Sequence, residues 1–337
     1  MFALVVLAAA AAACSGGGGG DRKTAAPAQR HLVYVAGDTP KTASVWIANV
    51  DGKNGRRLTS GFVAILSPDG TTVAVQRARQ GLFLVSSDGK RSRRLTPRPL
   101  RPQAWSPDGQ TVYATATSGP AVTALEAVDR ESGKSQTIAS GSLYGFDISP
   151  DGDRIVYSRA PKPTDQGICG DQFDLYTADL DGGSPKRLTH DGLSAFPVWG
   201  GSKIAFSHFP GGQSLADCGA PGVWTVNPDG SAEKPIIRRA PDAITLLGYY
   251  GFQPIAWLDE TRLLVGLRTA TGTRGAVLDT GTKKMRQLNV FADEASSDGR
   301  YAVGAGGDEG LVLSLVRTQD GHKVFTRKNA CCPDWNR

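Results

Sequence analysis

The chain has 337 residues, of which 40% are hydrophobic, 21% charged and 7% aromatic, a composition typical of a soluble globular protein with a sizeable core. The 42 glycines and 20 prolines indicate many turns but are too few for a collagen-like or low-complexity chain. The formal net charge of +6 is too dilute to indicate a nucleic-acid binder. A polytopic membrane protein is also excluded, since the one continuous apolar stretch lies at the N-terminus.

The first thirty residues have the pattern of an export signal followed by a tether. Residues 1–13 contain an uncharged apolar run that is too short to span a bilayer but suits the core of a secretory signal. The small residues before Cys14 resemble a bacterial lipobox, which implies that Cys14 is lipidated. Residues 14–30 are rich in glycine and are expected to be a flexible tether. A cleaved signal without lipidation and an uncleaved anchor are the alternatives, and all three place residues 31–337 outside the cytoplasm.

A repeated turn sequence occurs along the rest of the chain, which indicates an internal repeat. The tetrapeptide Ser-Pro-Asp-Gly occurs three times, and proline followed by Asp-Gly favours a tight turn. These turn residues are Pro68, Asp69, Gly70, Pro107, Asp108, Gly109, Pro150, Asp151 and Gly152. A degenerate copy occupies Ser296–Gly299, and two further variants follow Trp199 and Trp257.

Each of the six turns lies between two predicted strands. The strands after the turns alternate between apolar and polar residues, which indicates half-buried β-structure. They cover residues 72–76, 111–115, 154–158, 203–207, 262–266 and 300–304. In the best copies a third strand, an Asp-Gly hairpin turn and a fourth strand ending in Arg-Leu-Thr follow. Four antiparallel strands in roughly 40 residues correspond to one blade of a β-propeller.

The order of strand, tryptophan, Ser-Pro-Asp-Gly, two strands, Asp-Gly and Arg-Leu-Thr resembles the TolB-type, WD40-like (PD40) propeller repeat. The resemblance covers nearly all of residues 31–337 and implies an all-β propeller, but it indicates no particular activity. No segment of this sequence corresponds to the separate α/β domain that precedes the propeller in TolB. We therefore interpret the chain as a TolB-like propeller and not as TolB.

The number of blades follows from the two ends of the repeat region. The six turns mark six blades between residues 61 and 327, three predicted strands (32–35, 45–49 and 56–59) precede them, and one (330–335) follows. A C-terminal inner strand that completes a three-stranded N-terminal blade would remove the free sheet edges. The sequence therefore predicts seven blades with N–C strand closure; six blades is the alternative if one weak copy is an insertion.

Three expanded connections, 160–172, 209–222 and 239–252, belong to the fourth, fifth and sixth predicted blades and should share one face. Long loops on a rigid scaffold commonly bind partners, although these could also be insertions without a binding role. The candidate residues of this binding rim are Asp165, Asp171, Phe209, Asp217, Tyr249 and Tyr250. Cys169 and Cys218 lie in two neighbouring insertions, and we predict a disulfide between them.

The remaining reactive residues give little indication of catalysis. For Cys331 and Cys332 we prefer burial as inert thiols in the closing strand; a vicinal disulfide or pairing with the loop cysteines are the alternatives. The four histidines, His31, His190, His208 and His322, show no metal-binding spacing, and no nucleophile elbow occurs. No catalytic residue, metal site or cofactor is therefore predicted.

The sequence thus favours an exported, lipid-anchored, monomeric and non-catalytic propeller that binds a protein or polymer of the bacterial cell envelope, in the periplasm or at the cell surface. Basic clusters at the fourth strands are interpreted as protection of exposed sheet edges; attraction to anionic envelope polymers or lipid headgroups is the alternative. No nucleic-acid partner is expected, because aromatic residues do not interleave with these clusters. The competing hypothesis is a lyase- or lactonase-like propeller enzyme with a channel-facing metal site acting on a saccharide or lactone.

Overall fold

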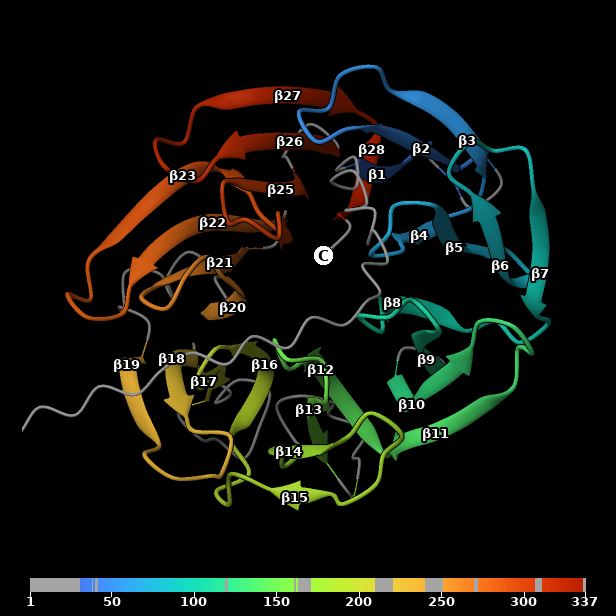
Figure 1. Cartoon of the computed structure of the whole chain (residues 1–337). Helices are drawn as coiled ribbons and strands as arrows, with labels where there is room; N and C mark the ends of the chain where they lie inside the picture. Colours follow the sequence, from blue (N-terminus) through green and yellow to red (C-terminus); the bar gives the residue numbers. More distant parts are fainter. Residues whose placement is uncertain are drawn as a thin grey trace, which may run out of the picture.

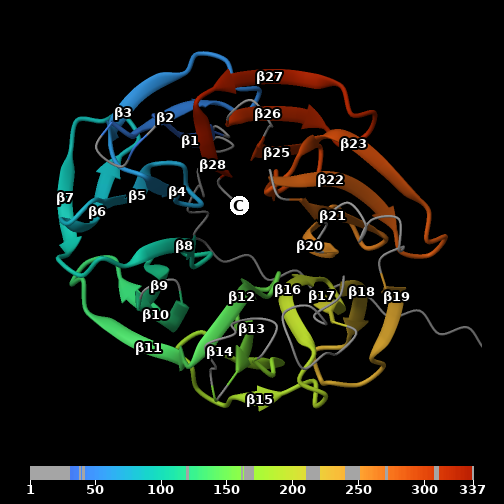
Figure 2. The same ribbon diagram turned by 180° about the vertical axis from the view of Figure 1, so that it is seen from behind.

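The computed structural model describes residues 31–37, 39, 42–118, 121–160, 162, 171–209, 221–239, 251–269, 272–306 and 311–335. These residues form seven four-stranded sheets arranged around a central axis (Figure 1). The view from behind shows the same ring, with one edge strand of each sheet toward the centre and the other edge strand at the periphery (Figure 2). Within the described ranges, no helix is long and apolar enough to cross a membrane.

We number the sheets as blades 1 to 7 in chain order. Blade 1 contains β28 (Ala330–Trp335), β1 (His31–Ala36), β2 (Ser44–Asn49) and β3 (Arg56–Ser60). Blade 2 contains β4 (Val63–Leu66), β5 (Thr72–Arg77), β6 (Gly81–Ser86) and β7 (Ser92–Thr96). Blade 3 contains β8 (Arg101–Trp105), β9 (Thr111–Ser118), β10 (Ala121–Asp129) and β11 (Ser135–Ser140). Blade 4 contains β12 (Ser142–Ile148), β13 (Arg154–Ala160), β14 (Asp174–Asp179) and β15 (Lys186–Arg187).

The last three blades follow the same order from the centre outward. Blade 5 contains β16 (Ser194–Gly200), β17 (Lys203–His208), β18 (Pro221–Val226) and β19 (Lys234–Arg239). Blade 6 contains β20 (Phe252–Trp257), β21 (Arg262–Thr269), β22 (Gly272–Asp279) and β23 (Met285–Phe291). Blade 7 contains β24 (Glu294–Ala295), β25 (Tyr301–Gly306), β26 (Val312–Arg317) and β27 (Lys323–Lys328).

The two ends of the described chain meet in blade 1. The C-terminal strand β28 pairs antiparallel with β1, with Val33 opposite Asp334 and Ala36 opposite Ala330. The predicted seven-bladed propeller with N–C strand closure is therefore confirmed, and the six-bladed alternative is wrong.

The hydrophobic core lies between neighbouring blades and not within them. Each of the seven blade-to-blade contacts has its own cluster of buried side chains. At the contact between blades 7 and 1, Leu32 and Tyr34 pack in one cluster with Leu315 and Trp335. A single blade would leave such surfaces exposed, which is why the ring must close to be stable.

The Ser-Pro-Asp-Gly segments form tight turns stabilised by their own side chains. The Ser106 hydroxyl donates to Asp108 at 2.6 Å and accepts the Thr111 N–H at 2.9 Å. Asp108 in turn accepts the Gln110 N–H at 3.0 Å. The hydrogen bonds from Ser106 and from the Gln110 N–H lower the pKa of Asp108 below its usual value.

The innermost strands carry a repeated β-bulge. The pairing register shifts between the innermost strand and its neighbour in blades 1, 3, 4, 5 and 6. Gly145, Phe196 and Cys332 lie within the register shifts of blades 4, 5 and 1, and their φ angles of 86°, 54° and 55° are all left-handed. Because a bulge re-aims the adjacent side chains, Gly145 and Phe196 help to shape the inner wall of the ring.

Cys331 and Cys332 are joined by a disulfide within β28. The preferred expectation that both cysteines remain inert thiols is therefore wrong, and the vicinal alternative applies. Both residues are half-buried and pack against the cluster that contains Val33 and Val35.

Candidate functional site

A cavity of about 330 Å³ opens at the centre of the ring. Its walls come mainly from the innermost strands of blades 3 to 7 and from their bulges. The described lining residues are Gln103, Ala104, Thr115, Leu125, Leu143, Gly145, Phe146, Asp147, Phe196, Pro197, Val198, Gln253, Pro254, Ile255, Asp293 and Glu294. This lining combines apolar and aromatic walls with three carboxylic acids, and it contains no histidine or cysteine.

Asp147 is held in place by hydrogen bonds from both blade 4 and blade 5. Its carboxylate accepts the N–H of Ile148 in its own strand at 2.9 Å and the N–H of Trp199 in blade 5 at 2.8 Å. Asp334 has the equivalent position in β28 and accepts the Leu66 N–H of blade 2 at 2.7 Å. These carboxylates therefore connect neighbouring innermost strands, and Asp147 also lines the cavity.

Asp293 and Glu294 add two neighbouring acids to the cavity wall. The Ala305 N–H donates to the Asp293 carboxylate at 2.9 Å. Asp293 is exposed at the surface of the cavity, but the surrounding atoms limit the hydration of its carboxylate, and together with the charge of Glu294 this raises the pKa of Asp293 to about 6. The cavity therefore gains negative charge as the pH rises through this value.

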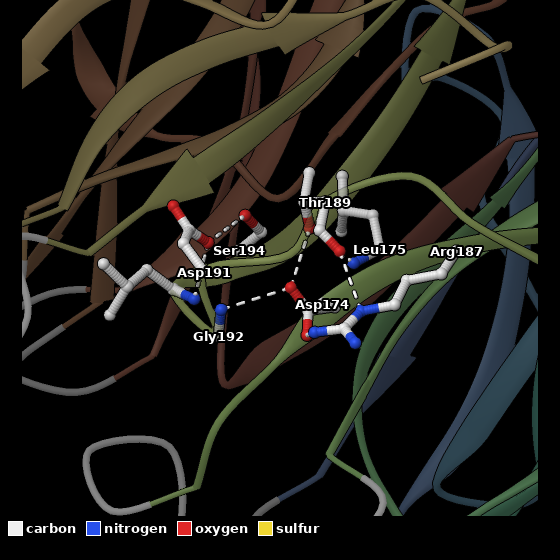
Figure 3. Close-up of polar contacts among 8 residues, drawn as sticks. Asp174, Leu175, Arg187, Thr189, Asp191, Gly192 and Ser194 are labelled. Atoms are coloured by element: carbon white, nitrogen blue, oxygen red, sulfur yellow. Dashed lines mark hydrogen bonds and ion pairs between the residues drawn. The ribbon is translucent and has the colours of Figure 1, made fainter. Parts of the chain in front are cut away.

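A second polar cluster lies where blade 4 passes into blade 5 (Figure 3). Asp174, at the start of β14, accepts the Thr189 hydroxyl and the Gly192 N–H, both at 3.2 Å, and forms an ion pair with Arg187. The Thr189 hydroxyl also accepts the Leu175 N–H at 3.0 Å. The Arg-Leu-Thr motif thus fixes the connection that leads into β16.

This connection presents Asp191 to a histidine at the end of β17. Asp191 accepts the Leu193 N–H at 3.0 Å, and its second oxygen lies 2.7 Å from Nε2 of His208. Partial burial acts to raise the pKa of Asp191, but the hydrogen bonds from His208 and the Leu193 N–H outweigh it and the net shift is downward. With Glu233, these residues form a group of possible metal ligands, none of which lines the central cavity.

Most of the predicted rim residues and both candidate disulfide cysteines lie outside the described residues, as does the lipidation site Cys14. They are Asp165, Cys169, Asp217, Cys218, Tyr249 and Tyr250. Of the two rim residues that the structure describes, Asp171 is buried, with 6% of its surface exposed. Phe209 is half-buried and packs against a small cluster with Phe173 and Ala195. The binding rim and the Cys169–Cys218 disulfide stay predictions.

The cavity acids were not identified from the sequence. Asp147 lies two residues before a Ser-Pro-Asp-Gly turn, and Glu294 lies two residues before the degenerate turn at Ser296. Aligning the six turns would have placed both acids at one position of the innermost strand. Asp293 has no such signal, because it precedes the short β24.

No family model and no curated protein sequence matches the chain. Its fold is similar to that of TolB from Acinetobacter baumannii, with a TM-score of 0.52 and 17% identity over 91% of this chain and 66% of that one. It is also similar to a puromycin-hydrolyzing peptidase of Mycobacterium tuberculosis, with a TM-score of 0.60 and 17% identity over 90% of this chain and 54% of the peptidase. An oligogalacturonate lyase in complex with manganese matches with a TM-score of 0.57 and 18% identity over 87% of this chain and 83% of the lyase.

At these low sequence identities, the structural similarities establish a common fold and nothing more specific. The chain spans 66% of the length of TolB and 54% of that of the peptidase. One scaffold thus occurs in proteins with different names and activities, so function has to be argued from the site. In fold, the chain is a seven-bladed β-propeller with TolB-like structural neighbours.

Proposed function

We propose that the chain is an exported, lipid-anchored and non-catalytic propeller of the bacterial cell envelope, and that it binds a segment of an envelope protein or polymer at its central cavity. The signal-like residues 1–13, Cys14 and the glycine-rich tether support the export and anchoring. The protein acts as a monomer in this proposal and has no nucleic-acid partner.

The observation that carries the proposal is the chemistry of the cavity wall. Asp147, Asp293 and Glu294 line one cavity together with the rings of Phe146 and Phe196. Such a site complements a cationic group carried on an apolar stem, as lysine and arginine side chains provide. Its volume of about 330 Å³ lies at the lower end of the range for ligand sites, which suits a short segment better than a folded domain.

Binding is favoured over catalysis because the cavity acids have structural partners. Asp147 and Asp293 both accept backbone N–H groups, which fixes them within the framework of the ring. The lining residues that the structure describes include neither histidine nor cysteine, the side chains that most often ligate catalytic transition metals together with carboxylates.

In this proposal the predicted rim continues the binding surface of the cavity. The expanded connections 160–172 and 209–222 belong to blades 4 and 5, and 239–252 leads into blade 6. The innermost strands of these three blades, β12, β16 and β20, all contribute to the cavity wall. A partner segment in the cavity could therefore continue onto these loops.

The test is to neutralise the cavity and measure partner recovery. The double variant Asp293→Asn/Glu294→Gln removes two cavity charges while keeping side-chain size, and Glu131→Gln/Glu260→Gln removes two exposed charges elsewhere. We expect affinity purification from envelope extracts, quantified by mass spectrometry, to recover about tenfold less partner with the cavity variant, because lost charge pairs weaken binding. Equal recovery with the wild type and both variants would contradict the proposal.

The wild type and the same variants also test the competing enzyme hypothesis. Turnover of an oligosaccharide or lactone by the wild type, with loss of that turnover in the cavity variant, would replace the binding proposal by a catalytic one. A stoichiometric metal ion that is lost only in the cavity variant would do the same.

A further inference from the structure

We propose that Asp191, His208 and Glu233 form a binding site for one divalent transition-metal ion, best matched by Zn²⁺, at the junction of blades 4 and 5. The three residues come from separate elements: the connection between β15 and β16, the end of β17, and the turn before β19. This site is distinct from the central cavity and is independent of the function proposed for that cavity.

The donor atoms are already close together. One potential ligand atom from each residue lies within 4.8 Å of the other two, and Nε2 of His208 is 2.7 Å from Oδ2 of Asp191. Zinc binds imidazole nitrogen and carboxylate oxygen at about 2.0–2.2 Å, so two donors on one tetrahedral ion lie roughly 3.4 Å apart. Small side-chain adjustments are therefore sufficient to place all three donors around one ion.

The histidine is held in a fixed orientation. Its side chain is only 12% exposed, and its ring stacks on Trp224 with 4.0 Å between ring centroids and 18° between planes. The other carboxylate oxygen of Asp191 accepts the Leu193 N–H. Such supporting contacts orient metal ligands and reduce the cost of binding.

The charge around the site also favours a cation. Although Glu233 is exposed, partial desolvation and the nearby carboxylates of Asp191 and Asp174 raise its pKa, while His208 and His190 act in the opposite direction. Asp174 is already paired with Arg187. A divalent ion would satisfy the Asp191 and Glu233 carboxylates together.

The donor set indicates the class of metal. One imidazole and two carboxylates leave a fourth position of a tetrahedral ion open for water or for a group supplied by another molecule. This mixture of nitrogen and oxygen donors suits zinc, and hard ions such as Mg²⁺ prefer oxygen donors throughout. Bound zinc would tie the connection between blades 4 and 5 to the end of β17 and to the turn before β19.

The test uses the purified full chain after treatment with a chelator. Titration with Zn²⁺, followed by calorimetry and elemental analysis, should show one tightly bound ion per chain. His208→Gln and Glu233→Gln should each weaken zinc binding at least about tenfold, because each removes a direct ligand. The matched controls are His322→Gln and Glu131→Gln, whose side chains are exposed and distant in the chain, and they should bind zinc as the wild type does.

Thermal unfolding provides a second readout. Zinc should raise the melting temperature of the wild type and of both controls, since a ligand that binds the folded state stabilises it. At the same zinc concentration it should raise that of Glu233→Gln by less than that of the wild type, and the exposed position of Glu233 makes this substitution compatible with folding even if His208→Gln is not. The cavity variant Asp293→Asn/Glu294→Gln should bind zinc normally, which separates this site from a metal at the axis.

Three results would overturn the proposal. The first is the absence of stoichiometric zinc binding by the wild type at micromolar concentration. The second is zinc affinity in Glu233→Gln equal to that of the wild type. The third is a Co²⁺-substituted protein with cobalt–thiolate absorption bands, because these would assign the ion to cysteines.

Discussion

Within the Ser-Pro-Asp-Gly turns, the serine and aspartate side chains accept hydrogen bonds from backbone N–H groups that would otherwise lack a partner in the turn. The same pair of contacts occurs at Ser67 with Asp69 and at the degenerate copy, Ser296 with Asp298. The proline of the motif is absent from that last copy, so the hydroxyl–carboxylate pair is the more persistent feature of the turn. Proline supplies only a preset φ.

Removing one turn hydroxyl should therefore destabilise the protein measurably. We expect Ser106→Ala to lower the free energy of unfolding by about 1–2 kcal/mol, because the Thr111 N–H loses its buried acceptor. The matched control is Ser202→Ala, an exposed serine in the corresponding turn of blade 5, which should change stability by less than about 0.5 kcal/mol. Urea denaturation monitored by tryptophan fluorescence measures both, and equal effects would contradict the assigned role.

Asp293 provides a prediction about pH. Its folded-state pKa of about 6 lies above the value of about 3.9 for an unfolded chain. Its contribution to stability is therefore complete below about pH 4 and is lost as the pH rises through about 6. Asp293→Asn should flatten this part of the stability–pH curve, measured by thermal unfolding between pH 4 and 8, whereas Glu131→Gln should retain the wild-type curve. An unchanged curve for Asp293→Asn would show that this carboxyl titrates normally.

At the level of the element, the innermost strands hold the ring together through paired contacts in both directions. Asp147 and Asp334 accept N–H groups of the following blade. In the other direction, Nε1 of Trp105 donates to the Ile65 carbonyl at 3.4 Å and Nε1 of Trp257 donates to the Val198 carbonyl at 3.3 Å. The tryptophan that precedes the turn in the sequence repeat therefore has a structural explanation.

Loss of one of these carboxylates should weaken a single blade-to-blade contact. Asp147→Ala and Asp334→Ala should each lower the free energy of unfolding by about 1–3 kcal/mol, since each leaves a backbone N–H of the next blade without its acceptor. Glu131→Ala, at an exposed site, is the control. If both aspartate variants unfold at the same urea concentration as this control, the carboxylates do not connect the blades.

Many strands were predictable because alternation and turn residues are local signals. The predicted strand at 72–76 is observed at Thr72–Arg77, and that at 203–207 is observed at Lys203–His208. The bulges were not predicted, because a register shift depends on the strand that pairs alongside. Arg187–Thr189 was expected to be a full fourth strand, but β15 contains only two residues because Thr189 turns to contact Asp174.

At the scale of the whole molecule, closure depends on the last strand. The sequence predicts this closure because three strands precede the six repeats and one strand follows them. Together these four strands complete one blade. The two polar sites were not predictable in this way. Asp191, His208 and Glu233 are spread over 43 residues and three elements. Only the strand pairing within blade 5, which sets Ser194 opposite His208, brings the connection that carries Asp191 beside the histidine.

Deleting residues 330–337 should open the ring. β1 would lose its partner strand, and the cluster around Leu32 and Tyr34 would lose Trp335. A single buried large side chain contributes about 1.5–3 kcal/mol, so we expect a loss of several kcal/mol and a markedly lower melting temperature by differential scanning calorimetry. A truncated protein that melts with the wild type would refute strand closure.

The claim that the central cavity receives a partner is tested most directly by site-specific photo-cross-linking in native cells. A photoreactive amino acid replaces Gln253 in the cavity wall, and as a control it replaces Lys323 on the outermost strand of blade 7. The account predicts a discrete cross-linked product from position 253 that is lost when Asp293→Asn/Glu294→Gln is added, and no such product from position 323. No product from position 253, or the same product from both positions, would contradict it.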